Sequence, residues 1–329
     1  MSFFTDYEKH ASEREKEGVP PLALNAKQTS EICELIKLAN KSSCDEKAQS
    51  ELKFLINLLT NRVNPGVDDA AKIKAEFLGE VIDGLAVNGL DAMRAIKILG
   101  KMLGGYNVEV LVRALKNSDE NIARAVANEL KNIILVHEYF DEIAKLASSN
   151  KFAKEVLVSW ANAEWFTHKK PIETCINAVV FKVPGETNTD DLSPASEAYT
   201  RADIPLHAKA MLVKKMPEGL EILKELKTRG KKVTYVGDVV GTGSSRKSGI
   251  NSIQWHLGDE IEGVPNKKTG GIVIGTTIAP IFFNTAEDSG ALPIVANVNE
   301  LEMGDEIEIY PFKGEIYKLI GSEKKLVAN

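Results

Sequence analysis

The sequence predicts a multi-domain protein of the α + α/β class, with an all-α region over residues 1–168 and an α/β region over residues 169–329. A chain of 329 residues is long enough to form two hydrophobic cores. Before Trp165, apolar residues recur with helical spacing; after it, β-branched apolar runs alternate with helical segments. The stretch "HKKP" (168–171) is the predicted linker.

The first region reads as a series of helices joined by short connections. Apolar residues at i, i+3 and i+4 place one apolar side on "SEICELIKLAN", and the spacing recurs in the segments that follow. Asp68 or Asp69 is the expected cap of the helix behind Pro65, and Gly104 with Gly105 is expected to end the next one. These helices form either a HEAT-like superhelical stack of helical pairs or a non-repetitive bundle.

The second region mixes strands and helices. Apolar, β-branched runs predict strands at residues 175–183, 232–237, 271–275, 291–298 and 305–311. A helix is expected at about 217–229, and a polar loop, "PGETNTDDLSPASEAYTRADIP", over 184–205. Trp160, Trp165 and Trp255 lie at apolar helical positions and are expected in the core.

Charge and hydropathy exclude several classes of protein. The net charge is −6, divided evenly as −3 before and −3 after residue 160, which lowers the expectation of general nucleic-acid binding. No apolar run approaches the ~18–20 residues of a membrane span, and the N-terminus is too charged for a signal peptide. We therefore expect a cytoplasmic protein with no membrane partner.

The cysteines do not form a recognisable ligand set. Cys33, Cys44 and Cys175 are far apart in sequence and include no CxxC pair. This spacing suits a reducing compartment and predicts no disulfide, iron–sulfur or zinc site built from this chain alone. Each is expected to be a small buried or half-buried side chain, with Cys175 at the start of a core strand.

One segment, "GDVVGTGSSRKSGINS" (237–252), carries the strongest chemical signal. It lacks the Gly-Lys pair of a Walker A loop, and Arg246 stands where a dinucleotide fingerprint needs its third glycine. What remains is a strand, a glycine turn and Ser-Ser-Arg at the start of a helix, an arrangement suited to a compact anion such as a carboxylate. Alternatively, Ser244 or Ser245 only caps the helix and Arg246 is a surface charge.

A family resemblance adds to this interpretation. "GTGSSRKS" resembles the GxGSSR loop on the swivel domain of aconitases and isopropylmalate isomerases, and "TNTDDLSPA" (187–195) resembles the TxDxISPA segment of the same domain. A helical domain ahead of the swivel domain is the order of the bacterial aconitase B family. "LTNRVNPGVDDAA", "SWANAEWF" and "IAPIFFNTAEDSGALPI" are also similar to that family, so the resemblance covers nearly the whole chain.

The resemblance implies a role for particular residues. Ser244 would be the base that exchanges the substrate's proton, while Ser245, Arg246 and Arg201 would bind substrate carboxylates. Asp190 and Ser193 match a polar pair behind the site, although an Asx-type turn explains them equally well.

Two neighbouring residues have less defined roles. His207 is expected to be a partly exposed structural histidine rather than a general base, because the family's catalytic histidines lie in other domains. Lys247 stands where many members have glutamate, and its role stays open.

The resemblance also implies an activity and its requirements. The expected domains are a HEAT-like domain (1–168) and a β/β/α-layered swivel domain (169–329), C-terminally incomplete, of an enzyme that interconverts citrate and isocitrate through cis-aconitate. The family's [4Fe–4S] cluster is held by cysteines of catalytic domains that would follow, so this chain is expected to bind no cluster and to be inactive alone. Whether 2-methylisocitrate is also a substrate stays open.

Two alternative hypotheses give the chain a different role. The helical domain could form a homodimer, and aconitase B members can bind messenger RNA once the cluster is lost, so an interaction or RNA-binding module is one alternative. A small subunit of an isopropylmalate-type isomerase is the other, although the helical domain in front argues against it.

Overall fold

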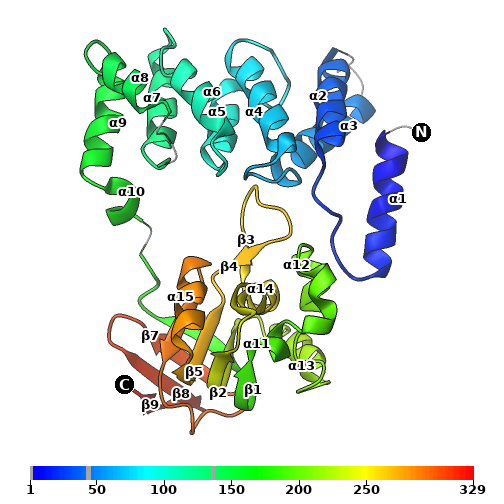
Figure 1. Ribbon diagram of the computed structural model, residues 1–329, viewed down its shortest axis with the longest axis vertical. Coiled ribbons are helices and arrows are strands. Elements are labelled where there is room, and N and C mark those ends of the chain that lie inside the picture. The colour runs from blue at the N-terminus through cyan, green and yellow to red at the C-terminus, as the bar shows by residue number, and fades with distance from the viewer. Residues whose placement is uncertain (1–2, 42–45, 135, 137, 170) are drawn as a thin grey trace. The chain divides into compact units, whose positions relative to one another are not determined.

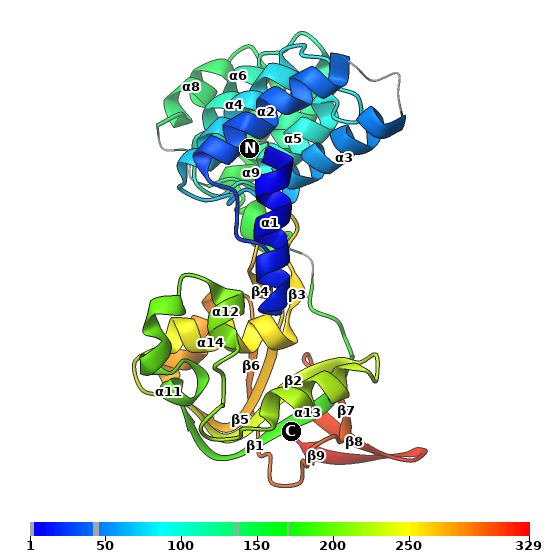
Figure 2. The same ribbon diagram turned by 90° about the vertical axis from the view of Figure 1, so that its right-hand side faces the viewer.

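The computed structural model describes residues 3–41, 46–134, 136, 138–169 and 171–329. The chain folds into two compact units (Figures 1 and 2). The helical unit lies within residues 1–17, 21–170 and 262–265, and the sheet unit within residues 18–20, 171–261 and 266–329. No helix among the described residues is both long and apolar enough to cross a membrane.

The helical unit is all-α, as the apolar spacing predicts. In chain order its helices are α1 (Phe3–Lys16), α2 (Ala26–Lys41), α3 (Glu46–Asn61), α4 (Asp69–Ile82), α5 (Ala92–Gly100), α6 (Tyr106–Ala114), α7 (Glu120–Leu130), α8 (Phe140–Leu146), α9 (Lys151–Ala161) and α10 (Glu164–Thr167).

Polar residues set where several of these helices begin. Asp68 accepts a hydrogen bond from the amide of Ala70 at the start of α4, which confirms it as the cap. Asp91, Asp119 and Asn150 serve α5, α7 and α9 in the same way. Each side chain satisfies an amide that would otherwise lack a partner inside its helix.

Successive helices pack in an overlapping order. α2 contacts α3 and α4, α4 contacts α5 and α6, α5 and α6 contact α7, and α7 contacts α9 (Figure 1). One continuous apolar core runs through them, with Ile32, Leu59, Leu78, Leu99 and Leu130 fully or almost fully buried. Each helix therefore depends on its neighbours for most of its stability.

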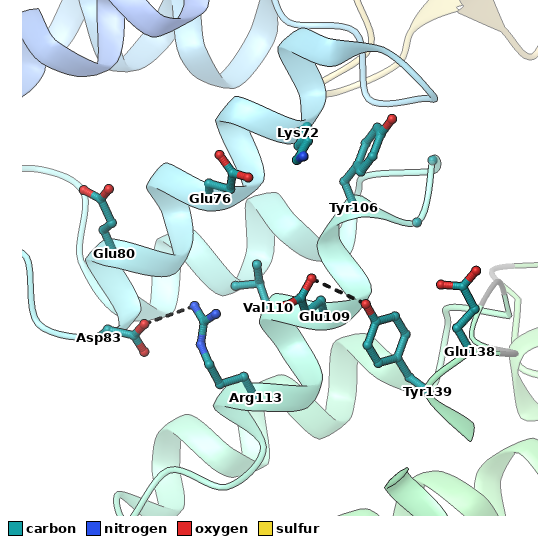
Figure 3. Close-up of a pocket in the computed structure, with 12 residues that line it drawn as sticks. Lys72, Glu76, Glu80, Asp83, Tyr106, Glu109, Val110, Arg113, Glu138 and Tyr139 are labelled. Carbon is teal, nitrogen blue, oxygen red and sulfur yellow. Dashed lines mark hydrogen bonds and ion pairs between the residues drawn. The ribbon is translucent and has the colours of Figure 1, made fainter. Parts of the chain in front are cut away.

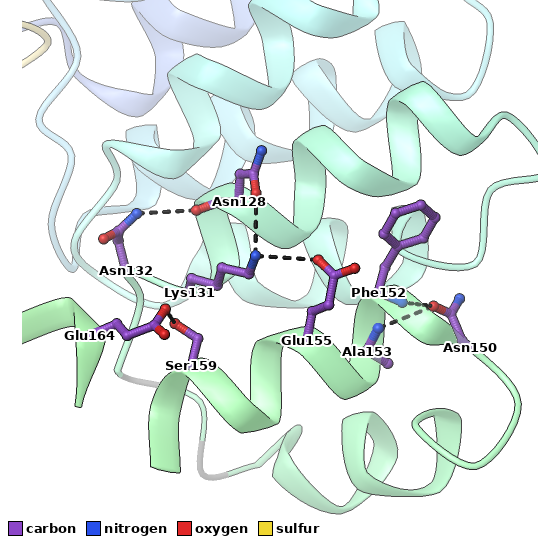
Figure 4. A network of polar contacts seen from close by, with 9 residues as sticks. All are labelled: Asn128, Lys131, Asn132, Asn150, Phe152, Ala153, Glu155, Ser159 and Glu164. Carbon is purple, nitrogen blue, oxygen red and sulfur yellow. Dashed lines mark hydrogen bonds and ion pairs between the residues drawn. The ribbon is translucent and has the colours of Figure 1, made fainter. Parts of the chain in front are cut away.

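Polar contacts join the last helices of the unit (Figure 4). Lys131, directly after α7, reaches Glu155 of α9 at 3.4 Å, and Ser159 donates to Glu164 of α10 at 2.6 Å. Trp160 packs against the core and donates from its indole nitrogen to the carbonyl of Leu130 at 3.1 Å. Both Trp160 and Trp165 are half-buried, so the prediction for Trp160 is confirmed only in its packing against the core, and Trp165 lies outside the core cluster.

The predicted end of the helix before Tyr106 is wrong. α5 ends at Gly100, and Gly105, at φ +90°, instead precedes the first residue of α6. A side chain on Gly104 would come within 2.3 Å of the Gly66 backbone, so glycine is needed there for a close approach of two chain segments.

The sheet unit follows in the order that the alternation of strands and helices predicts. Its elements are β1 (Ile176–Asn188), α11 (Thr189–Leu192), the 3₁₀ helix η1 (Ala195–Thr200), α12 (Ile204–Ala208), α13 (Gly219–Lys227), β2 (Lys232–Thr242), α14 (Arg246–Leu257), β3 (Asp259–Glu260), β4 (Lys268–Thr269), β5 (Ile272–Ile278), α15 (Pro280–Asp288), β6 (Leu292–Val295), β7 (Glu306–Tyr310), β8 (Glu315–Ile320) and β9 (Glu323–Ala328).

Seven strands form one mixed sheet in the order β6-β5-β2-β1-β7-β8-β9. β6, β5, β2 and β1 are parallel, while β7, β8 and β9 add as antiparallel neighbours. Val179 and Phe181 of β1 face a core shared with α13, α14 and α15, and Ala178 and Val180 face a second core with β7 and β8. Both faces of the parallel part are therefore buried.

Several details of this unit differ from the sequence predictions. Residues 184–205 are not a loop: they complete β1 and then form α11, η1 and the start of α12. The predicted strands at 175–183 and 232–237 are longer, and β8 and β9 were missed, because their exposed polar residues hide the period-two pattern. Trp255 is half-buried beneath Lys268 rather than in the core.

The cysteines agree with their predictions only in part. Cys33 is buried in the helical core, and burial raises the pKa of its thiol to about 12. Cys175 is half-buried and precedes β1 instead of opening it. Cys44 lies outside the described residues.

Candidate functional site

The predicted site forms where β1 and β2 end. These parallel strands pair along their length with two register shifts, and Asn188 lies opposite Thr242. The residues that follow, Thr189 and Gly243, therefore meet at the carboxyl edge of the sheet, where ligands of open α/β sheets bind. A side chain on Gly243 would come within 2.7 Å of the Thr189 hydroxyl oxygen, which explains the glycine.

The glycine turn before α14 needs both of its glycines. Gly241 and Gly243 have φ values of +83° and +98°, in the region that favours glycine. A side chain on Gly241 would also lie within 2.5 Å of the Phe282 ring. The turn thus brings the chain directly from β2 to the first residues of α14, as the motif predicts.

Ser245 occupies the N-cap position of α14, but its hydroxyl does not cap the helix. Its Oγ accepts a hydrogen bond from Arg201 Nη2 at 2.8 Å, and its backbone amide donates to Thr189 Oγ1 at 3.0 Å. The interpretation of Ser245 as a simple helix cap is therefore wrong. Instead, the contact joins two predicted site residues that are 44 positions apart in sequence.

Ser244 and Arg246 flank this contact. Ser244 is exposed, and its hydroxyl has no hydrogen-bond partner among the described residues. Arg246, at the first position of α14, is half-buried and donates from Nη1 to the carbonyl of Gly243 at 3.2 Å. Most of its guanidinium donors are thus available. Lys247 is exposed in the same helical turn.

Arg201 is held by the protein yet incompletely satisfied. Its guanidinium lies between the carbonyl of Ser193, at 3.5 Å, and the hydroxyl of Ser245. Its Nε is buried and has no partner within the part of the chain that the structure describes. A buried donor without an acceptor is costly.

Asp190 and Ser193 lie at the two ends of the short helix α11. Asp190 is exposed and accepts from the Ala195 amide at 2.6 Å, which stabilises the turn after α11. Ser193 is fully buried and contacts His207 rather than Asp190. The two residues make no hydrogen bond to each other in the described structure, so they are not a directly bonded pair.

His207 is buried, with only 2% of its surface exposed, which corrects the expectation of a partly exposed side chain. Its ring nitrogens lie 2.8 Å from Ser193 Oγ and 2.8 Å from Thr200 Oγ1. Desolvation by burial lowers the pKa of the imidazole. Sequence reasoning missed this network and the role of Thr189, because no local spacing links residues that meet only in the folded unit.

The arrangement as a whole suits an anion. α14 begins with no side-chain cap, so the amides of its first turn present unpaired donors and the positive end of the helix dipole. Arg246 and Arg201 add guanidinium groups that can bind carboxylates in a bidentate manner. Ser244 lies beside these donors with a free hydroxyl.

A groove of about 750 Å³ in the helical unit is a less suitable candidate (Figure 3). It lies between α4 and α6, and most of its charged lining residues are acidic. Arg113 pairs with Asp83 at 3.0 Å, and Tyr139 donates to Glu109 at 3.4 Å. The charge of Arg113 is thus already neutralised within the groove, and none of the predicted site residues lines the groove.

Comparisons with known proteins agree with the resemblance seen in the sequence. A family model described as the aconitate B N-terminal domain matches residues 6–166, and one described as the aconitate hydratase 2 N-terminus matches residues 178–329. A solved 3-isopropylmalate dehydratase structure from Methanocaldococcus jannaschii covers 47% of this chain and 81% of its own, at 23% identity and a TM-score of 0.35, too low to carry an argument.

Curated relatives extend the match over almost the whole chain. Proteins named aconitate hydratase B are 55% identical in Helicobacter pylori, 52% in Synechocystis sp. and 47% in Escherichia coli, over 95%, 96% and 94% of this chain. The chain spans 36% of the length of each of these relatives. With both family models in sequence order, the chain belongs to the aconitate hydratase B family, whose N-terminal region it matches.

Proposed function

We propose that this chain is the substrate-binding part of an aconitate hydratase that interconverts citrate and isocitrate through cis-aconitate. The relatives' names support the activity, but the chain spans only 36% of their length. The observation that carries the proposal is the contact of Arg201 with Ser245 at the uncapped start of α14. It gathers donors for several carboxylates at one place.

The proposed binding residues differ in what they offer. Arg246 presents a largely free guanidinium at the first turn of α14, and Arg201 adds a guanidinium held against Ser245. Ser245 accepts from Arg201, so its own proton is free to be donated to a substrate carboxylate oxygen. Together these groups suit a tricarboxylate better than a single small anion.

Ser244 is the proposed base that takes a proton from, and returns it to, a substrate carbon. A serine hydroxyl is a weak base unless its alkoxide is stabilised. The amides at the start of α14 and the Arg246 side chain supply positive potential next to it. The exposed position of Ser244 leaves it accessible to substrate.

The family implies an iron–sulfur cluster in the complete enzyme. Within the described ranges, no three His, Cys, Asp or Glu side chains are grouped closely enough to hold a metal ion. Cys33 and Cys175 belong to different units. The proposed contribution of this chain is to bind, orient and deprotonate the substrate.

The domain assignment is part of the proposal. The overlapping contacts of α2 to α9 support a HEAT-like array over residues 1–168, because solenoid helices contact mainly their neighbours in sequence. The mixed sheet with its helix-bearing face supports a swivel domain over residues 169–329. Homodimerisation and messenger RNA binding through the helical domain stay predictions.

Replacing Ser244 tests the proposal in the complete enzyme. Ser244→Ala leaves the carboxylate-binding groups in place, so KM should change little while kcat falls by about 10²–10⁴-fold. Steady-state kinetics with citrate and with isocitrate measure both constants. Ser248→Ala, one turn into α14, is the matched control and should retain full activity. A Ser244→Ala enzyme with normal kcat would refute the assignment.

A further inference from the structure

His207 links the two segments that hold Arg201. Ser193, which ends α11, lies 2.8 Å from Nε2, while Nδ1 lies 3.1 Å from the carbonyl of Glu197 and 2.8 Å from the Thr200 hydroxyl. Glu197 and Thr200 belong to η1, the 3₁₀ helix directly before Arg201. The ring therefore bridges α11 to the segment that carries the arginine.

The partners favour one tautomer of the ring. The Glu197 carbonyl can only accept, and it also accepts from the Thr200 hydroxyl at 2.8 Å, an arrangement that suits a proton on Nδ1. Nε2 is then left with a lone pair and accepts from the Ser193 hydroxyl. Burial lowers the pKa of the ring and so favours this neutral form. The imidazole thus holds a single orientation, with both nitrogens satisfied.

The bridge reaches the guanidinium of Arg201 from two sides. Thr200, bonded to the ring, is its neighbour in sequence, and Ser193, bonded to the opposite nitrogen, offers its carbonyl to Arg201 Nη2 at 3.5 Å. Arg201 in turn holds the Ser245 hydroxyl at 2.8 Å. A shift of η1 relative to α11 would therefore move the arginine away from Ser245.

We infer that His207 is a positioning residue for substrate binding, which holds the guanidinium of Arg201 against Ser245 by joining η1 to α11. The inference rests on the proposed function, because it assumes that Arg201 binds a substrate carboxylate. His207 itself touches neither Ser244 nor Ser245 in the described structure. It acts through Arg201 alone.

A double-mutant cycle in the complete enzyme separates an effect on the position of Arg201 from a general loss of protein stability. His207→Phe keeps the ring volume but removes both nitrogens, and should raise KM for citrate about three- to tenfold while kcat changes less. In an Arg201→Ala background the same substitution should raise KM by less than about twofold, since its target is already gone. Equal increases of KM in both backgrounds would overturn the inference.

A second variant covers failure of His207→Phe to fold. Ser193→Ala removes one hydroxyl and leaves the ring in place, so it should raise KM in the same direction and lose its effect in the Arg201→Ala background. His256→Phe is the matched control, because His256 lies in the same unit and its Nε2 is 2.8 Å from the Ala208 carbonyl, with no bond to Arg201. A rise in KM for His256→Phe equal to that for His207→Phe would contradict a specific role.

The cycle also distinguishes two kinds of failure. If Arg201→Ala leaves both KM and kcat unchanged, the proposed role of Arg201 is wrong and the inference falls with it. If Arg201→Ala weakens binding but neither His207→Phe nor Ser193→Ala raises KM, the proposed function stands and only the positioning role is wrong.

Discussion

The starts of α5 and α9 in the helical unit differ from the start of α14 in the sheet unit, although each unit also holds a helix of the other kind: α6 has no side-chain cap and α11 is capped by Asn188. In the helical unit, Asp91 accepts from the Arg94 amide at 2.7 Å and Asn150 accepts from two amides at the start of α9. In the sheet unit, α14 begins at Ser245, whose hydroxyl is held by Arg201 and does not cap the helix. At α5 and α9 a capping side chain accepts from the first amides of the helix, whereas at α14 these amides stay available for another partner.

Arg113 and Arg246 show the same difference. Arg113 of the helical unit forms an ion pair with Asp83 at 3.0 Å, which neutralises its charge. Arg246 of the sheet unit bonds only a backbone carbonyl among the described residues. Unsatisfied donors gathered at one point indicate function, since a fold selected for stability alone would pair them.

The largest expected effect comes from removing the planar guanidinium of Arg246. Arg246→Lys keeps the charge but removes the planar bidentate donor, so kcat/KM should fall about ten- to a hundredfold, or about 1.5–3 kcal/mol. Steady-state kinetics of the complete enzyme measure it. Arg113→Lys in the helical unit is the matched control and should leave kcat/KM unchanged; a similar loss there would remove the distinction between the units.

The next largest expected effect is a difference between the two units in how their free energy of unfolding depends on pH. Burial lowers the pKa of His256 to about 4 and that of Lys74 to about 8. The unfolded state then binds more protons between about pH 4 and 6.5 for His256 and between about 8 and 10.5 for Lys74. The sheet unit should therefore lose stability as pH falls through the first window, and the helical unit should gain it as pH rises through the second.

Within its pH window, each group changes the free energy of unfolding by at most about 1.4 kcal/mol per pH unit. Denaturation followed by fluorescence can report the units separately: Trp255→Phe leaves Trp160 and Trp165 in the helical unit, and the Trp160→Phe, Trp165→Phe double variant leaves Trp255 in the sheet unit. His256→Gln should flatten the acid window of the sheet unit. An unchanged slope in that variant would count against the assignment.

The smallest expected effects concern the caps themselves. Asp91→Ala should lower the free energy of unfolding of the helical unit by about 1 kcal/mol, while Asp91→Asn, which keeps an acceptor, should cost only a few tenths. Ser245→Asp supplies the missing cap and should stabilise the sheet unit by about 0.5–1 kcal/mol, yet weaken citrate binding. Urea denaturation measures the free energies of unfolding, and steady-state kinetics measure the effect of Ser245→Asp on citrate binding. Tighter citrate binding by Ser245→Asp would contradict the account.

Local patterns predicted much of the fold. The apolar spacing marked the helices of the first region, Asp68 was confirmed as a cap, and the glycine turn leads from a strand into a helix as the motif predicts. Predictions failed where tertiary contacts decide the structure. Gly104 is needed for a close approach to Gly66, not for a helix end. The helix α11 within "TNTDDLSPA" has a local cause that the sequence prediction missed, because Asn188 caps it.

The candidate site was predictable in its residues but not in its connections. The resemblance named Arg201, Ser244, Ser245 and Arg246, and the register of β1 against β2 explains why both segments end at one edge of the sheet. Nothing in the spacing of the chain shows that Arg201 meets Ser245 across 44 positions, or that His207 is buried between Ser193 and Thr200. Such contacts depend on packing between elements.

The central claim is that α14 begins without a cap because it binds a substrate carboxylate. The most direct test follows the backbone amide resonances of this chain by NMR during titration with citrate. The amides of Ser244 to Ser248 should shift in a saturable manner, while those of Ala92 to Arg94, at the capped start of α5, should not. Unshifted resonances at α14, or equal shifts at both helices, would contradict the claim.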